Sequence, residues 1–348
     1  MSRRCGMPTV RRRGRSCTAD PAARRPICLG KRGTMTQSVA IIGAGLAGAV
    51  CARALADAGL AVTVFEKSGG TGGRLSTRRS AAGSFDHGAQ YLTGRSAPMR
   101  ALLDQLGEEG AVAPWTPEGK DRPGDWHVGL PGMSGFVKPL LGGIDVRLRT
   151  RIDGIGFDSQ GQVRVTGADG LDHRFGRVVV TAPAPQAMAL TAPLDRGFEA
   201  LRDIVYAPCW AGMFAFAEPV ADLPDLTRGD DHGPGALIVR NSSKPGRDGA
   251  TFVVHGGGAW SAQHLEHEPK AIVPYLQGAL ERCAGQPLAP VHATAHRWRY
   301  ARVDRALGES HLVTGCGRVV VCGDGLVGGR AEAAAQSGWA AAAAILDR

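Results

Sequence analysis

Three glycines near the start of the sequence have the spacing of a phosphate-binding turn. Gly43, Gly45 and Gly48 follow the pattern G-x-G-x-x-G, in which the first glycine allows a tight turn and the second lets a pyrophosphate approach the backbone. The third lets a helix lie close to the preceding strand. Glu66 stands about twenty residues further along, where a carboxylate can bond ribose hydroxyls. These four residues predict a dinucleotide site.

The segments around these glycines must form a strand, a turn, a helix and a second strand. Val39–Ile42 and Val62–Phe65 are apolar runs that predict strands, and Leu46–Ala58 is rich in helix formers and ends at Gly59. With these flanks the pattern favours a dinucleotide site over its alternative, a plain glycine-rich strand-helix-strand unit. The residues expected to contact the cofactor here are Gly43, Ala44, Gly45, Leu46, Ala47, Gly48, Glu66 and Lys67.

A second glycine-rich loop follows the second strand and indicates which dinucleotide is bound. It leads from Lys67 through Gly73 to Arg74. Such a loop can wrap more backbone N–H groups around a diphosphate, and Arg74 adds a positive charge that a nicotinamide-only site does not usually have. The loop therefore favours FAD, with Gly73 and Arg74 as contacts, and a flexible surface loop is the alternative.

The segment Ser84–Arg95 carries polar side chains beside a turn of small residues. Gly88 and Ala89 would let backbone approach a flat ring, so Ala89 and Gln90 are expected to contact the cofactor. His87 is expected to be a solvated loop residue and a poor base. The residues expected to face a substrate beyond the ring are Gln90, Tyr91 and Thr93.

The end of the chain returns to the same site. Val319–Cys322 predicts an apolar strand that ends at Asp324, and a helix follows from about Ala331 to Leu346. Asp324 is placed to bond the ribityl chain, and the helix N-terminus would favour the negative charge that a flavin acquires on reduction. Because this strand joins the first strand's sheet from the far end of the sequence, the cofactor domain must be discontinuous.

The middle of the chain is typical of an antiparallel sheet with helices on one face. The predicted fold class is α/β plus α+β, a discontinuous Rossmann-like FAD-binding domain with an inserted substrate domain. The FAD-binding domain is expected at 35–95, 143–190 and 305–348, and the substrate domain at 96–142 and 191–304.

Several residues of the substrate domain are candidates for the pocket. His255 lies at a strand end beside three glycines, which makes it a tentative catalytic or substrate-binding residue, and a packed histidine is the alternative. Trp210 would stack on a flat substrate if it faces the cleft and belong to the core if it does not. In the polar turn Asn241–Asp248, Lys244 and Arg247 could meet a substrate phosphate, but a solvated hairpin is favoured.

Charge and cysteine content exclude several functions. Residues 1–34 hold ten of the 41 Lys and Arg residues behind the net charge of +9, so the rest is neutral and nucleic acid is not an expected partner. These residues are expected to be an overlong start before Met35 or a disordered basic arm. The cysteines form no C-x-x-C pair, which favours reduced thiols in the cytoplasm and no metal site. No apolar run is long enough to span a membrane.

The order of these motifs resembles the FAD-dependent amine oxidase superfamily. GAGLAG, FEK, GGRLSTRR and DHGAQY follow one another, and later segments look like the bacterial renalase group. The resemblance implies that the strand near Ile152 lies over the adenine. Two departures, Gly325 in place of an aromatic residue and a short stretch between Trp115 and Trp126, are expected to enlarge or reshape the substrate side. The later segments are Pro131–Phe136, Val178–Ala187, Asn241–Asp248, Val254–Ser261, Ala295–Arg302 and Val321–Gly338.

The resemblance implies an oxidase that takes hydride from dihydropyridine isomers of NAD(P)H and uses O₂ to form H₂O₂. One dinucleotide fingerprint and no redox cysteine pair argue against a disulfide reductase. No acid-base set is evident beyond His255, and a dihydropyridine needs mainly to be held against the flavin, because its oxidation yields an aromatic cation. The rivals are an amine oxidase or desaturase on the same scaffold, and a non-catalytic FAD-binding scaffold. These features do not predict the oligomeric state.

Overall fold

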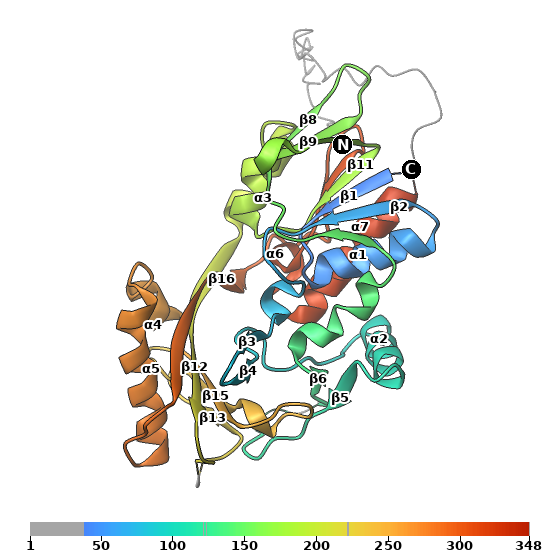
Figure 1. Cartoon of the computed structure of the whole chain (residues 1–348). Coiled ribbons are helices and arrows are strands. Elements are labelled where there is room, and N and C mark those ends of the chain that lie inside the picture. The colour runs from blue at the N-terminus through green and yellow to red at the C-terminus, as the bar shows by residue number, and fades with distance from the viewer. Residues whose placement is uncertain (1–37, 121, 123, 221–222, 348) are drawn as a thin grey trace, which may run out of the picture.

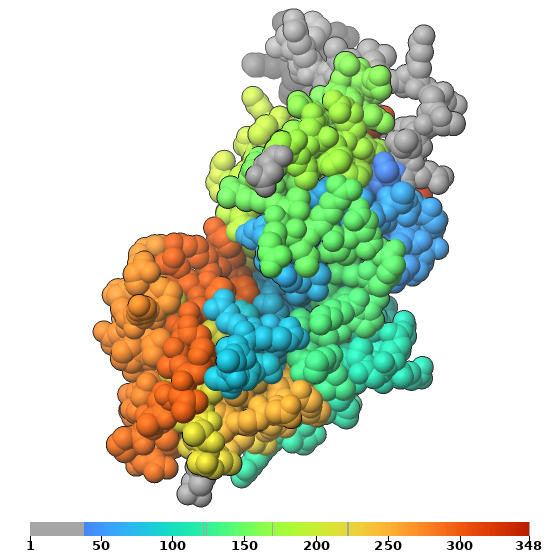
Figure 2. All heavy atoms as spheres, in the orientation of Figure 1, coloured from blue at the N-terminus to red at the C-terminus, as the bar shows by residue number. Residues whose placement is uncertain are grey.

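The fold has two adjoining parts, each built on its own large β-sheet (Figure 1). The computed structural model describes residues 38–120, 122, 124–220 and 223–347. The expected overlong start or basic arm at 1–34 lies outside the described residues. In the space-filling view the surface is hollowed where blue and cyan atoms of the first part face orange atoms of the second (Figure 2).

The first part is built on a six-stranded sheet in the order β17-β18-β11-β1-β2-β7. Its strands are parallel except β17, which is antiparallel to β18. Because β17 and β18 come from the end of the chain, this domain is discontinuous, as predicted. The strands are β1 (Ser38–Ile42), β2 (Ala61–Phe65), β7 (Asp145–Arg147), β11 (Arg177–Val180), β17 (Leu312–Val313) and β18 (Val319–Val321).

Both faces of this sheet are covered, which explains why its central strands are apolar at successive positions. Along β1, Val39 and Ile41 belong to the core that includes helices α1 and α7, whereas Ala40 and Ile42 pack with a small antiparallel sheet and α3. Figure 1 shows α1 and α7 together on one side of the sheet. The covering elements are α1 (Leu46–Asp57), α7 (Ala331–Leu346), α3 (Ala184–Thr191), β8 (Ile152–Phe157), β9 (Val163–Gly167) and β10 (Asp172–Phe175).

The second part is a five-stranded antiparallel sheet in the order β13-β14-β15-β12-β16. Its long strands β12 and β16 extend toward the first part, and α4 and α5 cover one face (Figure 1). The predicted combination of α/β and α+β architecture is thereby confirmed. The elements are β12 (Val205–Phe216), β13 (Leu226–Arg228), β14 (Leu237–Arg240), β15 (Ala250–His255), β16 (His292–Arg305), α4 (Gly258–Gln263) and α5 (Pro269–Ala284).

The described residues of 96–142, a range that the sequence assigns to the substrate domain, pack between the two parts. Met99, Leu103 and Phe136 lie in the same apolar core as α1 and α7, and this core also includes Leu226 and Val239 of the second sheet. Among the described residues, no helix has both the length and the apolar character that crossing a membrane requires. The remaining elements are α2 (Ala97–Glu108), β3 (Arg78–Ser80), β4 (Gly83–Phe85), β5 (Val112–Pro114), β6 (His127–Gly129) and α6 (Asp324–Val327).

The contact between α1 and α7 depends on a glycine. A side chain on Gly338 of α7 would clash with the backbone carbonyl of Ala47 in α1. We therefore expect Gly338→Ala to lower the free energy of unfolding by about 2–3 kcal/mol, because overpacking forces the helices apart. Gly278 of α5 is the matched control, since a Cβ there would meet only the end of the flexible Arg282 side chain, at 3.4 Å.

Gly278→Ala should raise stability by about 0.5–1 kcal/mol through helix propensity. Urea unfolding of both variants followed by circular dichroism measures the two effects. Equal effects of the two substitutions would contradict the close packing of α1 on α7.

Candidate functional site

The first glycine turn is closely packed on two sides and open on a third. Gly43 has a left-handed φ of +113°, its N–H donates to the carbonyl of Phe65 at 2.8 Å, and a side chain there would clash with Thr181. A side chain on Gly48 would clash with the carbonyl of Gly43. By contrast, a Cβ on Gly45 would meet no atom within 4 Å. The backbone is therefore accessible at the position where the spacing predicts a diphosphate.

The carboxylate at the end of β2 is held against this turn. Glu66 is 7% exposed, and its Oε2 accepts a hydrogen bond from the N–H of Ala44 at 2.9 Å. Its Oε1 accepts from the N–H and the hydroxyl of Ser68, at 2.8 and 2.5 Å. The carbonyl of Glu66 accepts from the N–H of Thr150, which brings the start of β8 next to the same turn.

The other residues predicted to contact the cofactor near this turn differ in which of their atoms are accessible. Leu46 and Ala47 are buried in α1, at 5% exposure each. The side chain of Ile152 belongs to the apolar core, so its backbone is the part available to an adenine. Lys67 is exposed and its Nζ donates to Oε1 of Gln186 at 3.0 Å.

The second glycine loop lies directly beside the first. The N–H of Gly72 donates to the carbonyl of Ala44 at 2.8 Å, and Gly45 and Gly72 form a parallel bridge. Gly73 has a φ of +55°, and a Cβ on it would lie 3.3 Å from the Cα of Gly45. Two stretches of glycine-rich backbone therefore lie side by side at the accessible turn.

Arg74 and Asp324 form an ion pair that joins distant segments. The guanidinium donates from Nη1 to Oδ2 at 2.7 Å and from Nη2 to Oδ1 at 2.6 Å, and Nη1 also donates to the carbonyl of Ala301 in β16. The sequence places Arg74 at a diphosphate and Asp324 at a ribityl chain. The structure brings them together, but their opposite charges largely cancel within the pair.

The turn of small residues packs on the same arginine. The N–H of Ala89 donates to the carbonyl of Arg74 at 2.9 Å, and a side chain on Gly88 would clash with that carbonyl. Both glycine loops, the Gly88–Ala89 turn, β16 and the start of α6 therefore converge on Arg74. A flavin dinucleotide requires accessible backbone, a carboxylate at the spacing that reaches a ribose, and an acidic residue at the end of a strand, which here is Asp324.

Comparison with known families agrees with this geometry. A family model described as flavin-containing amine oxidoreductase matches residues 116–346, more than half of the chain, and one described as an NAD(P)-binding Rossmann-like domain matches residues 41–106. The chain belongs to the flavin-containing amine oxidoreductase family. It is an FAD-dependent oxidoreductase, and the open side of Gly45 and the Glu66 carboxylate fit the diphosphate and a ribose of that cofactor.

Individual relatives support the family and the fold. Protoporphyrinogen oxidase 2 of Arabidopsis thaliana is 41% identical over 69 residues, which are 20% of this chain and 14% of that protein. Cyclohexylamine oxidase from Brevibacterium oxydans IH-35A superposes with a TM-score of 0.70 at 16% identity, covering 89% of this chain and 99% of that one. Putrescine oxidase bound to putrescine gives a TM-score of 0.67 at 15% identity, with the same coverage. At these identities the two structures show a shared fold.

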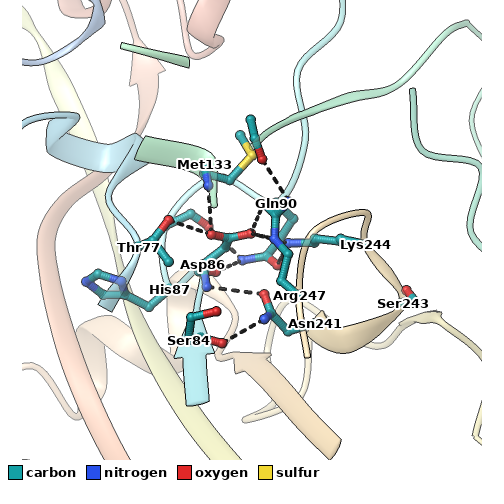
Figure 3. Close-up of polar contacts among 12 residues, drawn as sticks. Thr77, Ser84, Asp86, His87, Gln90, Met133, Asn241, Ser243, Lys244 and Arg247 are labelled. Carbon is teal, nitrogen blue, oxygen red and sulfur yellow. Dashed lines mark hydrogen bonds and ion pairs between the residues drawn. The ribbon is translucent and has the colours of Figure 1, made fainter. Parts of the chain in front are cut away.

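A buried ionic network lies beside the Gly88–Ala89 turn of the oxidoreductase (Figure 3). Asp86 is fully buried, and its Oδ2 accepts from Lys244 at 3.3 Å and from Arg247 at 2.6 and 3.1 Å. Its Oδ1 accepts from the hydroxyl of Thr77 and the N–H of Met133. Burial alone would raise the pKa of the Asp86 carboxyl, but the two cations outweigh it and lower the pKa to about 2.

The expectation of a solvated hairpin at Asn241–Asp248 is wrong. Lys244 is 2% exposed and Arg247 is 6% exposed, so neither is available to a substrate phosphate. Burial lowers the pKa of Lys244 to about 8, with Asp86 opposing the shift. The turn folds inward because Asp86 is the counter-ion of both cations and because Asn241 accepts the N–H of Asp86 at 3.2 Å.

Gln90 connects this network to His255. Its Oε1 accepts from Lys244 at 2.8 Å, and its Nε2 donates to the carbonyls of Asp86 and Gly88 and lies 3.3 Å from Nε2 of His255. Both polar atoms of the Gln90 side chain are thus hydrogen-bonded within the protein, and the residue is 4% exposed. It can position the turn, but it has little surface left for a ligand.

Tyr91 and Thr93 lie further along the same segment. The Tyr91 ring stacks on Trp126 with centroids 3.7 Å apart, and its hydroxyl accepts from Arg228 at 3.1 Å. Trp115 pairs with Trp126 through the backbone, and both indoles are buried, so the two residues that flank the short stretch meet in an aromatic contact. Thr93 is half-buried.

Three imidazoles and an indole form an aromatic cluster next to Gln90. His87 stacks on Trp298 with centroids 5.1 Å apart, and His296 meets both rings edge-on. Nε2 of His255 and the indole N–H of Trp298 both lie within hydrogen-bond distance of the carbonyl of His87, at 3.2 and 2.9 Å. The expectation of a solvated His87 is wrong, because the side chain is 5% exposed beneath these rings.

Burial keeps the imidazoles of this cluster uncharged at neutral pH. It lowers the pKa of His87 to about 3, aided by His296 and Arg78, and lowers that of His255 to about 4. The pKa of His296 is lowered to about 4 by burial and by Arg78, which contacts its Nδ1 at 3.3 Å. The predicted pocket histidine, His255, is therefore neutral and hydrogen-bonded to backbone.

Trp210 does not reach this cluster. It is fully buried on the helix side of the second sheet, and its indole N–H donates to the carbonyl of His264 at 3.0 Å. The alternation of side chains along β12 directs it to the core, so the expectation that it stacks on a substrate is wrong.

Gly325 does not enlarge the site as expected. A side chain on Gly325 would clash with the phenol of Tyr206 from β12, which occupies that space. The Tyr206 hydroxyl accepts from the N–H of Ala184 at 3.1 Å, and its ring meets Tyr300 edge-on at 5.5 Å. The second sheet thus supplies the aromatic group that α6 lacks. Sequence reasoning missed Tyr206 and His296, and it did not pair Lys244 and Arg247 with Asp86. These contacts join segments far apart in the chain, so no local signal marks them.

Gly45 offers a test of the cofactor site. Gly45→Ala should leave the fold intact, because the added methyl meets no protein atom within 4 Å and φ is −79°. The methyl would enter the space that the diphosphate needs, so we expect FAD affinity to fall at least about tenfold, or 1.4 kcal/mol. Gly107→Ala in α2, which also meets open space, should bind FAD normally. Fluorescence titration of FAD into apoprotein measures both; unchanged affinity of Gly45→Ala would place the diphosphate elsewhere.

The neutral imidazoles predict a pH dependence of stability. His87 is protonated in the unfolded chain below its ordinary pKa of 6.5 but stays neutral in the fold until about pH 3. The unfolded state therefore binds more protons in this window, and stability falls with falling pH by up to about 1.4 kcal/mol per unit for this group. Urea unfolding between pH 7 and pH 5 should show a shallower decline for His87→Gln than for the wild type. The exposed His267→Gln should match the wild type; a His87→Gln profile that also matches it would refute the assignment.

Proposed function

We propose that this oxidoreductase oxidises dihydronicotinamide isomers of NAD(P)H, the substrate class of the renalase group that its motifs resemble. The proposal rests on the chemical composition of the cluster formed by His87, His255, His296 and Trp298. Within the described chain, none of the hydrogen bonds or ring contacts of these four residues involves a carboxylate. A neutral dihydropyridine ring suits such a surface, because it needs stacking partners and no counter-ion.

The residues of the chain then serve to hold the substrate rather than to move protons. The half-buried rings of His296 and Trp298 offer aromatic surface, with His87 buried beneath them, and the low pKa of His87 and His255 keeps imidazolium ions away from it. Bound FAD supplies the two-electron acceptor, which takes a hydride and is reoxidised by O₂ to give H₂O₂. Because loss of hydride makes the nicotinamide ring aromatic, no side chain has to remove a proton from it.

An amine oxidase is the second candidate. The family description and the shared fold of cyclohexylamine oxidase and putrescine oxidase fit an amine substrate as well. Charge speaks against it here: Arg78 contacts His296, and the buried Lys244 helps to lower the pKa of His255. An alkylammonium ion would meet the Arg78 guanidinium at this cluster, and the neighbouring Asp86 carboxylate is already paired with Lys244 and Arg247.

Anaerobic mixing of the FAD-loaded enzyme with candidate substrates tests the proposal. The panel contains dihydronicotinamide isomers, cyclohexylamine, putrescine and an apolar polyene, and the loss of oxidised-flavin absorbance is followed by stopped flow. We expect the dihydronicotinamides to reduce the flavin at least about tenfold faster per molar than any other member, which corresponds to 1.4 kcal/mol of transition-state stabilisation. Faster reduction by an amine would establish the second candidate and exclude the first.

A further inference from the structure

A cavity of about 580 Å³ lies where α7 begins, beside β16 and the residues that precede α2. Its lining includes three guanidinium groups, from Arg95, Arg302 and Arg330, and one carboxylate, from Glu332. Volumes of roughly 300–1,000 Å³ are usual for sites that bind small molecules. The cavity is therefore large enough for part of a substrate.

The side chains of two of the three arginines form no hydrogen bond or salt bridge within the described residues. Neither the Arg95 nor the Arg330 side chain makes a hydrogen bond or an ion pair with another residue in the part of the chain that the structure describes, and both residues are exposed. Arg302 differs, because it is shared between Asp304 at 3.1 Å and Asp231 at 3.8 Å. The positive charge available to a ligand thus comes from Arg95 and Arg330.

The single carboxylate of the lining offsets only part of this charge. Burial raises the pKa of Glu332, but hydrogen bonds from Ser96 and Arg95 and the charge of Arg330 outweigh it and lower the pKa. Glu332 is 5% exposed, and its oxygens accept from the N–H of Ser96 at 2.6 Å and from the N–H of Arg95 at 3.2 Å. Glu332 stands in the first turn of α7, so its charge also opposes the positive end of that helix, and the remaining positive charge of the cavity comes from its arginines. The cavity therefore carries a surplus of positive charge.

The cavity adjoins the cofactor residues through two elements. Arg302 follows Ala301 in β16, whose carbonyl accepts from Arg74. On the other side, two glycines of the lining follow α6, the helix that begins at Asp324. The cavity lining is thus next in the chain to the residues that contact or form the Arg74–Asp324 pair.

We propose that this cavity binds the phosphate groups of the substrate, with Arg95 and Arg330 as their ligands. The inference deepens the proposed function and rests on it, because dihydronicotinamide dinucleotides carry a diphosphate. Guanidinium groups bind phosphate oxygens through paired, charge-assisted hydrogen bonds, so an exposed pair at a cavity suits this ligand. A cationic amine would be repelled from the same wall.

Calorimetric titration of pyrophosphate into the FAD-loaded enzyme tests the site without requiring turnover. We expect binding that weakens with salt and at least about tenfold weaker binding by the double variant Arg95→Gln/Arg330→Gln. Arg151→Gln is the control, because Arg151 is exposed, does not line the cavity and pairs with Asp153. Equal binding by the double variant and the wild type would overturn the proposal, as would tighter binding of succinate than of pyrophosphate.

Steady-state kinetics separates this proposal from the proposed function. The double variant should raise KM for dihydronicotinamide dinucleotides at least about tenfold but change KM for an uncharged N-alkyl dihydronicotinamide far less. Arginine-dependent pyrophosphate binding without flavin reduction by any dihydronicotinamide would keep the phosphate site and reject the function. Reduction by the dinucleotides with an unchanged KM in the double variant would keep the function and reject the site.

Discussion

The buried carboxylate of Asp86 fixes the geometry on which the rest of the site depends. An ion withdrawn from water costs several kcal/mol unless it is paired and hydrogen-bonded. Lys244 and Arg247 from the second part of the chain pair with Asp86, and Thr77 and Met133 supply further hydrogen bonds. The same pairing brings Lys244 to Gln90, which holds the carbonyls of Asp86 and Gly88. The position of the small-residue turn against Arg74 is therefore set by charges far away in the sequence.

The charges around the site carry information about the substrate that the fold alone does not. Asp86 has two cationic partners, the imidazoles beside it are neutral, and the cavity at α7 adds the unpaired Arg95 and Arg330. A fold fixes where a cofactor binds, whereas the substrate is selected by the groups that line the remaining space. The anionic substrate proposed above would require no change in the topology shared with amine oxidases.

The sequence predicted the features that arise from local spacing. Short patterns of residue type and spacing predicted the glycine turn from Gly43 to Gly48 and the apolar strand β18. The discontinuous domain follows from these two predictions. Lys244 and Trp210 were misjudged because their surroundings are created by tertiary contacts. Lys244 is polar yet buried, since its counter-ion Asp86 comes from a distant loop. Trp210 is aromatic yet faces α4 and α5, since the register of β12 directs it there.

The pair Gly325 and Tyr206 shows why a single departure from a family pattern cannot be interpreted by itself. Loss of a side chain after Asp324 suggests more space when only that segment is considered. In the fold, the phenol of Tyr206 enters from β12, and its hydroxyl accepts the N–H of Ala184 beside the first sheet. Tyr206 requires the absence of a Cβ at position 325, so the two residues form one structural unit. A substitution that restores an aromatic group at 325 must displace Tyr206 and with it a contact between the two parts of the molecule.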